Sequence, residues 1–151
     1  MANKALADVA VTDSHIAKCF DVMHQLRPHL VREDFVATVR SMQQEGFKLA
    51  FLEVGNQVVA VAGYRIYSNL HMGRHCYVDD LVTAAEHRSK GYGDQLLAWV
   101  RKRAIEAGCN VLHLDSGTHR GSAHRFYFSQ GFTIASYHFT QSLEEELGQG
   151  G

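Results

Sequence analysis

The sequence has 151 residues and a formal net charge of −1 with histidine neutral, so no basic excess indicates nucleic acid and no acidic run indicates disorder. Its content of 46% hydrophobic and 21% charged residues is typical of one globular domain, which we expect to span residues 1–151. The N-terminus lacks the apolar core of a signal peptide, and no apolar run reaches membrane-spanning length. Three cysteines without a C-x-x-C pair are typical of reduced thiols, so we expect a cytoplasmic protein with no membrane partner.

The first half of the chain predicts a strand, two helices and a hairpin. A Ser or Asp before an apolar-periodic run is a helix start, so Asp13 or Ser14 is expected to cap the first helix, which Pro28 ends. Gly55-Asn56 separates two β-rich runs and predicts a tight hairpin turn. The expected elements are a strand at 5–12, helices at 15–26 and 32–46, and a hairpin at 47–67.

The second half alternates strands and helices, and the last residues are rich in Glu and Gly. This order predicts an α/β or α+β sheet with helices on both faces. The expected elements are strands at 75–83, 110–116 and 132–140, helices at 94–108 and 122–131, and a flexible tail at about 142–151.

A basic turn with two glycines, Arg88-Ser-Lys-Gly91-Tyr-Gly93, lies between the strand at 75–83 and the following helix. Backbone amides at a helix N-terminus attract phosphate, and glycine lets the backbone approach it closely. The turn lacks the Gly-Lys-Ser/Thr ending of a P-loop and the third glycine of a dinucleotide fingerprint. Taken alone, it fits a phosphate site and an ordinary helix start about equally well.

A second motif lies downstream, in SAHRFYFSQGF at Ser122–Phe132. With the Arg/Gln-x-x-Gly-x-Gly turn, this segment resembles the GNAT superfamily of acetyl-CoA-dependent N-acetyltransferases, which carries a similar Ala-x-x-x-Tyr-x-x-x-Gly-Phe pattern at this distance. The run from about Tyr77 to Phe139 fits the family, with a weaker similarity to aminoalkylphosphonate acetyltransferases. The matching residues of the pattern are Ala123, Tyr127, Gly131 and Phe132.

The resemblance implies a mixed, mostly antiparallel sheet flanked by helices on both faces, and acetyl-CoA as acetyl donor without a metal. It implies that the pantetheine arm pairs with a strand edge, that one amide there stabilises the oxyanion, and that the diphosphate binds the turn. Many relatives carry Asn where this chain has Arg120, so Ser116, His119 or Ser122 is expected to supply that contact. The implied donor-binding residues are Leu81, Val82, Thr83, Arg88, Ser89, Lys90, Gly91, Tyr92, Gly93, Asp94, Ser116, Ser122 and Tyr127.

The reaction moves protons at two places, and the resemblance implies a residue for one of them. Tyr127 matches the family tyrosine that protonates the leaving thiolate, whereas an aromatic that only packs the core is the alternative. The base candidates are Asp79, Asp80 and Glu53, since the attacking amine must be neutral. Strand alternation predicts that Asp79 and Asp80 point to opposite faces, so that at most one faces the cleft.

Three functions stay open from the sequence: an N-acetyltransferase acting on a primary amine, a non-catalytic acetyl-CoA-binding regulatory module, and an unrelated domain that binds another phosphate ligand. The first is favoured, with a small-molecule amine as partner, no nucleic acid, and a homodimer as a possible assembly. The ten histidines invite a metal site, but the group at His71, His75 and Cys76 lacks the second donor pair of a structural zinc site, so no metal is expected. His138 or bulk water is the fallback base.

Overall fold

The structure is a computed structural model that describes residues 4–144, and the chain divides into two compact units. The first unit extends to Leu114 and the second begins at Asp115. Of the elements bounded within the described residues, the first unit holds a five-stranded sheet with four α-helices, and the second holds one α-helix. The expected single domain over residues 1–151 stays a prediction. Residues 145–151 of the expected tail lie outside the described residues.

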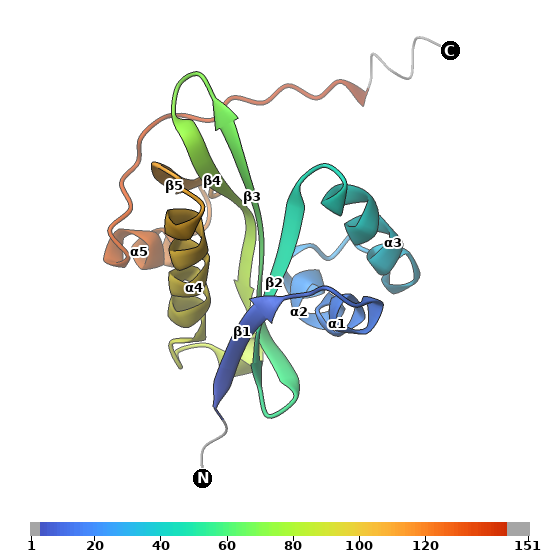
Figure 1. The fold of residues 1–151 in the computed structure, drawn as a ribbon. Helices are drawn as coiled ribbons and strands as arrows, with labels where there is room; N and C mark the ends of the chain where they lie inside the picture. The colour runs from blue at the N-terminus through green and yellow to red at the C-terminus, as the bar shows by residue number, and fades with distance from the viewer. Residues whose placement is uncertain (1–3, 145–151) are drawn as a thin grey trace. The chain divides into compact units, whose positions relative to one another are not determined.

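The sheet of the first unit has its strands in sequence order, as Figure 1 shows. Neighbouring strands are antiparallel from β1 to β4, and only β4 and β5 are parallel. The predicted mixed, mostly antiparallel sheet is therefore confirmed. The strands are β1 (Ala5–Val9), β2 (Phe47–Val54), β3 (Gln57–Asn69), β4 (Gly73–Thr83) and β5 (Val111–Leu114).

Helices cover both faces of this sheet. Three N-terminal helices pack on one face, and α4 packs on the other (Figure 1). Because successive side chains of a strand point to opposite faces, β2 and β3 contribute buried residues to both cores. The helices are α1 (Asp13–Lys18), α2 (Phe20–Leu26), α3 (Arg32–Gln43) and α4 (Tyr92–Glu106) in the first unit, and α5 (Gly121–Ser129) in the second.

The tight turn between β2 and β3 forms as the sequence predicts. Gly55 and Asn56 both have positive φ, 56° and 66°, which are the backbone angles of a type I′ hairpin turn. The helix before Pro28 ends at Leu26, as expected. Its start differs from the prediction, because Thr12 and neither Asp13 nor Ser14 is the cap residue.

Thr12 lies in extended backbone, and its hydroxyl oxygen accepts a hydrogen bond from the amide of His15 at 3.1 Å. Thr12 thus satisfies one of the free amides in the first turn of the helix, which Asp13, already helical, cannot do as a cap. The expected helix at 15–26 is also split in two, with Cys19 between α1 and α2.

The strand expected at 132–140 does not form. This segment has alternating apolar residues, but none of the described strands pairs with it, and Ile134, Tyr137 and Phe139 are exposed. A strand is stable only when another strand satisfies its backbone groups, so alternation alone was insufficient evidence. Within residues 4–144, no helix is long and apolar enough to cross a membrane.

The three cysteines are free thiols. Burial raises the pKa of Cys19 and of Cys76 to about 12, and Cys109 is partly exposed. These thiols agree with the reduced state expected from the sequence.

Helix α4 offers a test of the core. Leu96 is fully buried in the core between α4 and the sheet, whereas Ile105 on the same helix is 67% exposed. Leu96→Ala should lower the free energy of unfolding by about 2–5 kcal/mol, because it removes buried methyl groups and leaves a cavity. Ile105→Ala should change it by less than about 0.5 kcal/mol. Urea unfolding measures both, and equal losses would contradict the packing of α4 described above.

Candidate active site

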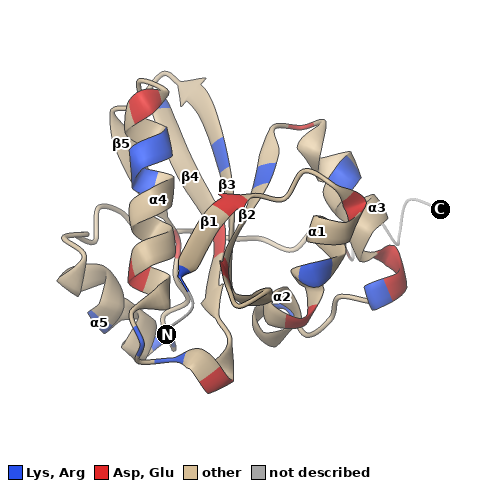
Figure 2. Ribbon diagram, turned by 60° about the horizontal axis from the view of Figure 1, so that its bottom comes forward, with Lys and Arg blue, Asp and Glu red and all other residues tan. Residues whose placement is uncertain are grey.

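The turn between β4 and α4 has the backbone of an anion site. Ser89 and Gly91 adopt positive φ of 66° and 79°, and Gly91 is the N-cap residue of α4. Among residues 4–144, no side chain caps the start of this 15-residue helix, so its first-turn amides keep the positive end of the helix dipole open. Arg88 and Lys90 are exposed in this turn, whose basic residues Figure 2 colours blue.

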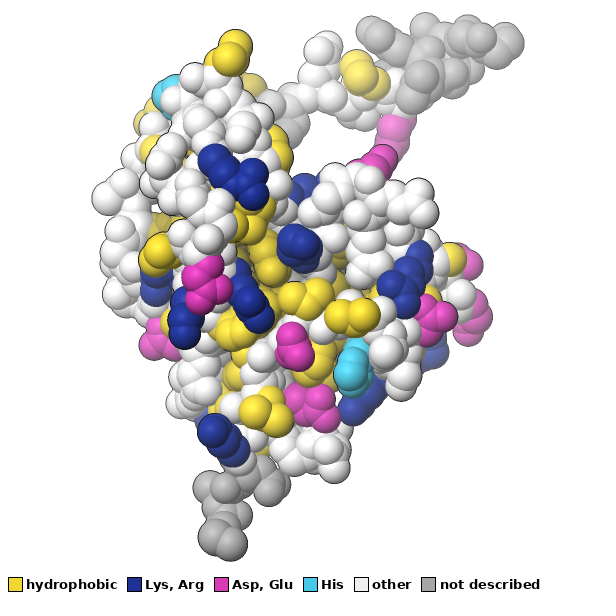
Figure 3. Space-filling view, in the orientation of Figure 1, with side chains coloured by type: hydrophobic (Ala, Val, Ile, Leu, Met, Phe, Trp, Pro, Cys, Tyr) yellow, Lys and Arg dark blue, Asp and Glu magenta, His cyan; other side chains and the backbone are white. Residues whose placement is uncertain are grey.

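The surface seen in Figure 3 has no large patch of one charge, since basic and acidic side chains are mixed over the helices. Hydrophobic side chains are visible on the same face between α4 and the N-terminal helices.

Strand β4 continues beyond the end of its ladder with β5. The parallel pairing covers His75–Val78 of β4, whereas β4 runs on to Thr83. Leu81, Val82 and Thr83 pair with β3 on one side, and none of the described strands pairs with them on the other. The predicted donor-binding strand therefore has a free backbone edge directly before the glycine turn.

The two aspartates of β4 lie on one face of the sheet, so the prediction of opposite faces is wrong. The register between β3 and β4 shifts by one residue, since Gly63 pairs with Asp80 and Tyr64 pairs with Val78. Asp79 is the additional residue, as in a β-bulge, and the alternation of side chains restarts after it.

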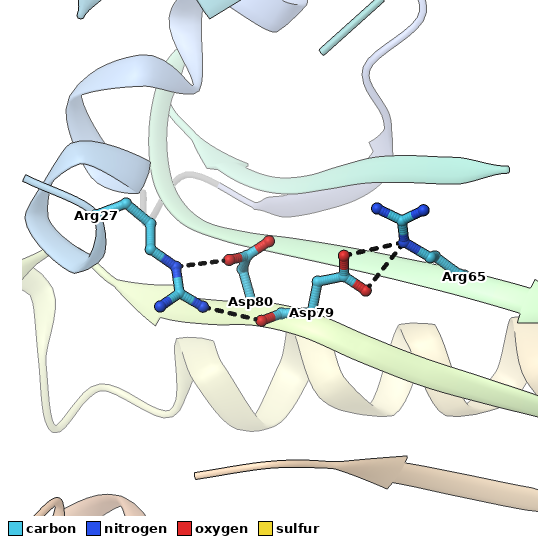
Figure 4. Close-up of polar contacts among 4 residues, drawn as sticks. All are labelled: Arg27, Arg65, Asp79 and Asp80. Atoms are coloured by element: carbon cyan, nitrogen blue, oxygen red, sulfur yellow. Dashed lines mark hydrogen bonds and ion pairs between the residues drawn. The ribbon is translucent and has the colours of Figure 1, made fainter. Parts of the chain in front are cut away.

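Two arginines neutralise these aspartates, as Figure 4 shows. Arg27, at the end of α2, donates from Nε to Asp80 Oδ1 at 2.9 Å and from its terminal nitrogen to the carbonyl of Asp79 at 3.1 Å. Arg65 of β3 donates from Nε to both carboxylate oxygens of Asp79, at 3.0 and 3.3 Å. Sequence analysis missed both arginines, because each partner lies at least 14 positions away and forms no motif.

The environment of Asp80 makes its carboxylate more basic than that of an ordinary aspartate. Burial raises the pKa of Asp80 above its ordinary range, and the neighbouring Asp79 adds to this, whereas the hydrogen bond and charge of Arg27 oppose it. Of the two carboxylate oxygens of Asp80, only Oδ1 accepts a hydrogen bond from a described residue. Its Oδ2 faces Gly63, where a Cβ atom would lie 2.6 Å away. Oδ2 of Asp80 therefore has no hydrogen-bond partner among the described residues.

A pocket of about 300 Å³ opens in front of Asp80. Apolar side chains from α2, α3 and β2 form most of its wall, and Arg27, His29 and Asp80 are its charged or titratable members. This arrangement suits a small ligand with an apolar body and one polar or charged end. The lining residues are Met23, Arg27, His29, Leu30, Phe35, Thr38, Val39, Met42, Phe47, Leu49 and Asp80.

Glu53, the third base candidate, lies outside this pocket. Glu53 forms a salt bridge with Lys18 at 3.2 Å and does not line the pocket. Asp79 also has its carboxylate occupied, by Arg65. The geometry of the first unit thus favours Asp80 among the three candidates.

The second unit carries the predicted acid. Tyr127 lies on α5, with its ring in edge contact with Phe126 and Phe132 at centroid distances of 5.4 and 5.6 Å. Burial raises the pKa of the Tyr127 phenol, and the charge of Arg120 partly opposes this. The phenol is therefore protonated near neutral pH and has a proton to give.

The residues of the second unit that were predicted to contact acetyl-CoA differ in their exposure to solvent. The Ser116 hydroxyl is buried and has no hydrogen-bond partner among residues 4–144, as expected for a group whose partner is a ligand. Ser122 is exposed at the first turn of α5. His138 forms a 3.5 Å ion pair with Asp115 when it is protonated. Within the first unit, the open strand edge and the start of α4 both offer unpaired backbone groups.

A family model described as the acetyltransferase (GNAT) family matches residues 12–132. The chain belongs to the GNAT family. This GNAT protein is therefore an acetyl-CoA-dependent N-acetyltransferase, which confirms the activity expected from the two motifs.

Curated relatives agree with this assignment. The N-acetyltransferase YhdJ of Bacillus subtilis is 38% identical over 129 residues, which cover 84% of this GNAT protein and 91% of YhdJ. The aminoalkylphosphonate N-acetyltransferase of Salmonella typhimurium is 33% identical over 82 residues, which cover 50% of this chain and 53% of that enzyme.

A solved structure supports the fold. The aminoglycoside N-acetyltransferase AAC(6')-Iy in complex with a bisubstrate analogue of coenzyme A and acetylneamine superposes with a TM-score of 0.80 at 14% identity, over 92% of this chain and 97% of that one.

The two glycines that flank α4 give a matched test of the turn. Gly91 and Gly108 have nearly equal φ, 79° and 80°, and no atom lies within 4 Å of a Cβ at either position. Asp at each site strains the backbone by about 1–2 kcal/mol. Gly91→Asp should abolish acetyl-CoA binding in calorimetry, because its charge opposes the diphosphate, whereas Gly108→Asp should leave binding measurable. Unchanged affinity in a folded Gly91→Asp variant would exclude the turn as the diphosphate site.

Proposed function

We propose that this GNAT protein transfers the acetyl group of acetyl-CoA to the primary amine of a small molecule by direct attack within a ternary complex. The observation that carries the proposal is a partly buried carboxylate, Asp80, which lines a small pocket and lies on the strand whose free edge leads to the glycine turn. The elements for binding the donor and the acceptor are thus joined by one strand of the first unit.

The donor is proposed to bind along β4. Leu81, Val82 and Thr83 offer free backbone groups to the amides of the pantetheine arm, and one amide there stabilises the oxyanion. The diphosphate binds the amides of the turn from Ser89 to Asp94, with Arg88 and Lys90 adding charge. Ser116 is the proposed polar contact from the second unit, since its buried hydroxyl lacks a partner among residues 4–144.

The acceptor is proposed to occupy the pocket at Asp80. An alkylamine has a pKa near ~10.4, so about one molecule in a thousand is neutral at pH 7 and the site must remove a proton. Asp80 can hold the cationic amine with its free oxygen and accept a proton from the attacking nitrogen, and its raised pKa makes it a better acceptor than an exposed carboxylate. Arg27 positions the Asp80 carboxylate through the 2.9 Å hydrogen bond.

Tyr127 is the proposed acid that protonates the departing thiolate. A phenol with a pKa of ~10 or above matches a thiolate of comparable basicity. We also propose a cytoplasmic location, which the three free thiols support.

A panel of amines tests the proposed function. Purified protein is mixed with acetyl-CoA and aminoalkylphosphonates, aminoglycosides, polyamines or amino acids, and loss of the thioester is recorded. The relatives named above make the first two classes the natural starting points. Acetylation of a small amine well above the rate of acetyl-CoA hydrolysis is expected. Acetylation of protein lysines alone would contradict the small-molecule acceptor.

Substitution of Asp80 tests its proposed role as the general base. Asp80→Asn should lower kcat/KM by about 10²–10⁴-fold and leave acetyl-CoA affinity nearly unchanged. Since the base must be ionised, kcat/KM of the parent should fall as the pH falls through the raised pKa of Asp80, and this limb should be absent from the variant. Glu53→Gln is the matched control, because Glu53 lies outside the pocket. Full activity of Asp80→Asn would exclude this base.

Tyr127 gives the prediction on the acid. Tyr127→Phe keeps the ring contacts with Phe126 and Phe132 and removes the phenol. Turnover should fall by at least ~10-fold with near-normal acetyl-CoA affinity. Thermal unfolding should show a loss of no more than about 1 kcal/mol, because the ring contacts are kept and at most one hydrogen bond is removed. A variant with full turnover would reject Tyr127 as the acid, and an unfolded one would indicate a purely structural role.

A further inference from the structure

The pocket at Asp80 keeps its apolar and polar surfaces apart, and this separation indicates what kind of amine it binds. Four buried side chains form its inner wall: Met23 of α2, Phe35 and Val39 of α3, and Leu49 of β2. None of these four side chains can form a strong hydrogen bond. The part of a ligand that lies against this wall is therefore apolar, since a polar group there would lose its hydrogen bonds to water.

The polar residues of the pocket are few, and their exposure differs. His29 and Thr38 are exposed, so they lie where the pocket opens to solvent. The side chain of Asp80 is only 13% exposed, and Asp80 is the one acidic residue in the described lining. An ionised carboxylate accepts hydrogen bonds and cannot donate them. The inner polar group of the pocket therefore binds the N–H groups of an amine and repels an anion.

Arg27 leaves little positive charge for an anionic ligand. It is the one residue of the described lining with a permanent positive charge. Its Nε and one of its terminal nitrogens already bind Asp80 and the carbonyl of Asp79 (Figure 4). A phosphonate or carboxylate in the pocket would therefore lie mainly against apolar side chains, and burial of an anion without a partner is strongly unfavourable.

The second oxygen of Asp80 lies beside an aromatic ring. A Cβ atom at Gly63 would lie 2.4 Å from the Phe47 ring and 2.6 Å from Oδ2 of Asp80, so the ring and this oxygen are neighbours above Gly63. Oδ2 has no hydrogen-bond partner among the described residues. An amine that donates to Oδ2 thus brings the carbon atoms next to its nitrogen against the Phe47 ring.

The size and composition of the wall suit an aromatic group. A volume of about 300 Å³ is at the lower end of the range for small-molecule pockets, so one ring and a short chain fill it. Met23 and Met42 have flexible, polarisable side chains, which pack well against aromatic rings. Phe35 and Phe47 add aromatic surface for edge or offset contacts.

We propose that the pocket at Asp80 binds an arylalkylamine as the acceptor, that is, a primary amine joined by a short chain to one uncharged aromatic ring. The inference rests on the proposed function, which takes this pocket as the acceptor site. In the transfer, a bond forms between the amine nitrogen and the acetyl carbon, and the C–S bond of the thioester breaks. The ammonium loses two protons, of which one balances the proton taken up by the thiolate and the other leaves to solvent.

Two amines that differ only in their end group test the acceptor class. 2-Phenylethylamine and 2-aminoethylphosphonate share a primary amine and a two-carbon chain. With acetyl-CoA, kcat/KM should be at least about 100-fold higher for 2-phenylethylamine, because its ring gains from burial while the phosphonate loses hydration without a partner. Equal values, or a higher value for 2-aminoethylphosphonate, would overturn the acceptor class and leave the proposed acetyl transfer intact.

A cation placed in the wall should shift this preference. Met42 is half-buried and lines the pocket, whereas Met72 is half-buried in the β3–β4 turn and does not line it. Met42→Lys should lower kcat/KM for 2-phenylethylamine by about 10- to 100-fold and raise it for 2-aminoethylphosphonate. Met72→Lys is the matched control and should leave both values unchanged. A folded Met42→Lys variant with the preference of the parent would contradict the proposal.

Methyl NMR of the parent protein without acetyl-CoA tests binding apart from turnover. Met23 and Met42 line the pocket, and Met72 does not. Titration with 2-phenylethylamine should shift the methyl signals of Met23 and Met42 and leave that of Met72 unchanged, whereas 2-aminoethylphosphonate should shift none of the three. These shifts without acetylation of any amine would reject the proposed transfer and retain the ligand class. Acetylation of other amines without these shifts would overturn the ligand class and retain the transfer.

Discussion

The one-residue register shift at Asp79 is the constraint on which the site depends. Without it, Asp79 and Asp80 would point to opposite faces, and one carboxylate would enter the apolar core against α4. With it, both carboxylates lie on the side of the N-terminal helices, where two arginines can reach them (Figure 4). The pairing with β5 stops at Val78, immediately before the shift, so the change of face and the free strand edge occur at the same place.

The arginines make this arrangement energetically acceptable. A buried carboxylate without a partner is strongly unfavourable, and two adjacent ones repel each other. Arg27 and Arg65 give the group of four residues no net charge, and Arg27 also binds the Asp79 carbonyl at the shift itself. The end of α2 is thereby tied to β4, so that the helix forming the pocket wall and the strand carrying the carboxylate keep a fixed relation.

The sequence predicts the parts of this molecule that local patterns determine. The hairpin turn at Gly55-Asn56, the buried face of α4 and the glycine turn all follow from short-range preferences, and the structure contains each of them. The register shift was not predictable, because it depends on how β3 and β4 pair and leaves no mark in the alternation around Asp79. The contact of His75 with His113 spans 38 positions and was missed for the same reason. The strand expected at 132–140 is the reverse case. Its residue pattern is present in the sequence, but none of the described strands pairs with it.

The state of the thiols has a practical consequence for enzymology. Transfer of the acetyl group liberates the sulfhydryl of coenzyme A, which aromatic disulfide reagents report through a coloured product. Cys19 and Cys76 are buried, and burial raises the pKa of each to about 12, so neither presents a thiolate to such a reagent while the protein is folded. Cys109 alone is partly exposed. In a continuous colorimetric assay, the protein's own thiols should therefore consume at most one equivalent of the disulfide reagent per folded chain. Consumption of more reagent by the protein would show that it is unfolding during the assay.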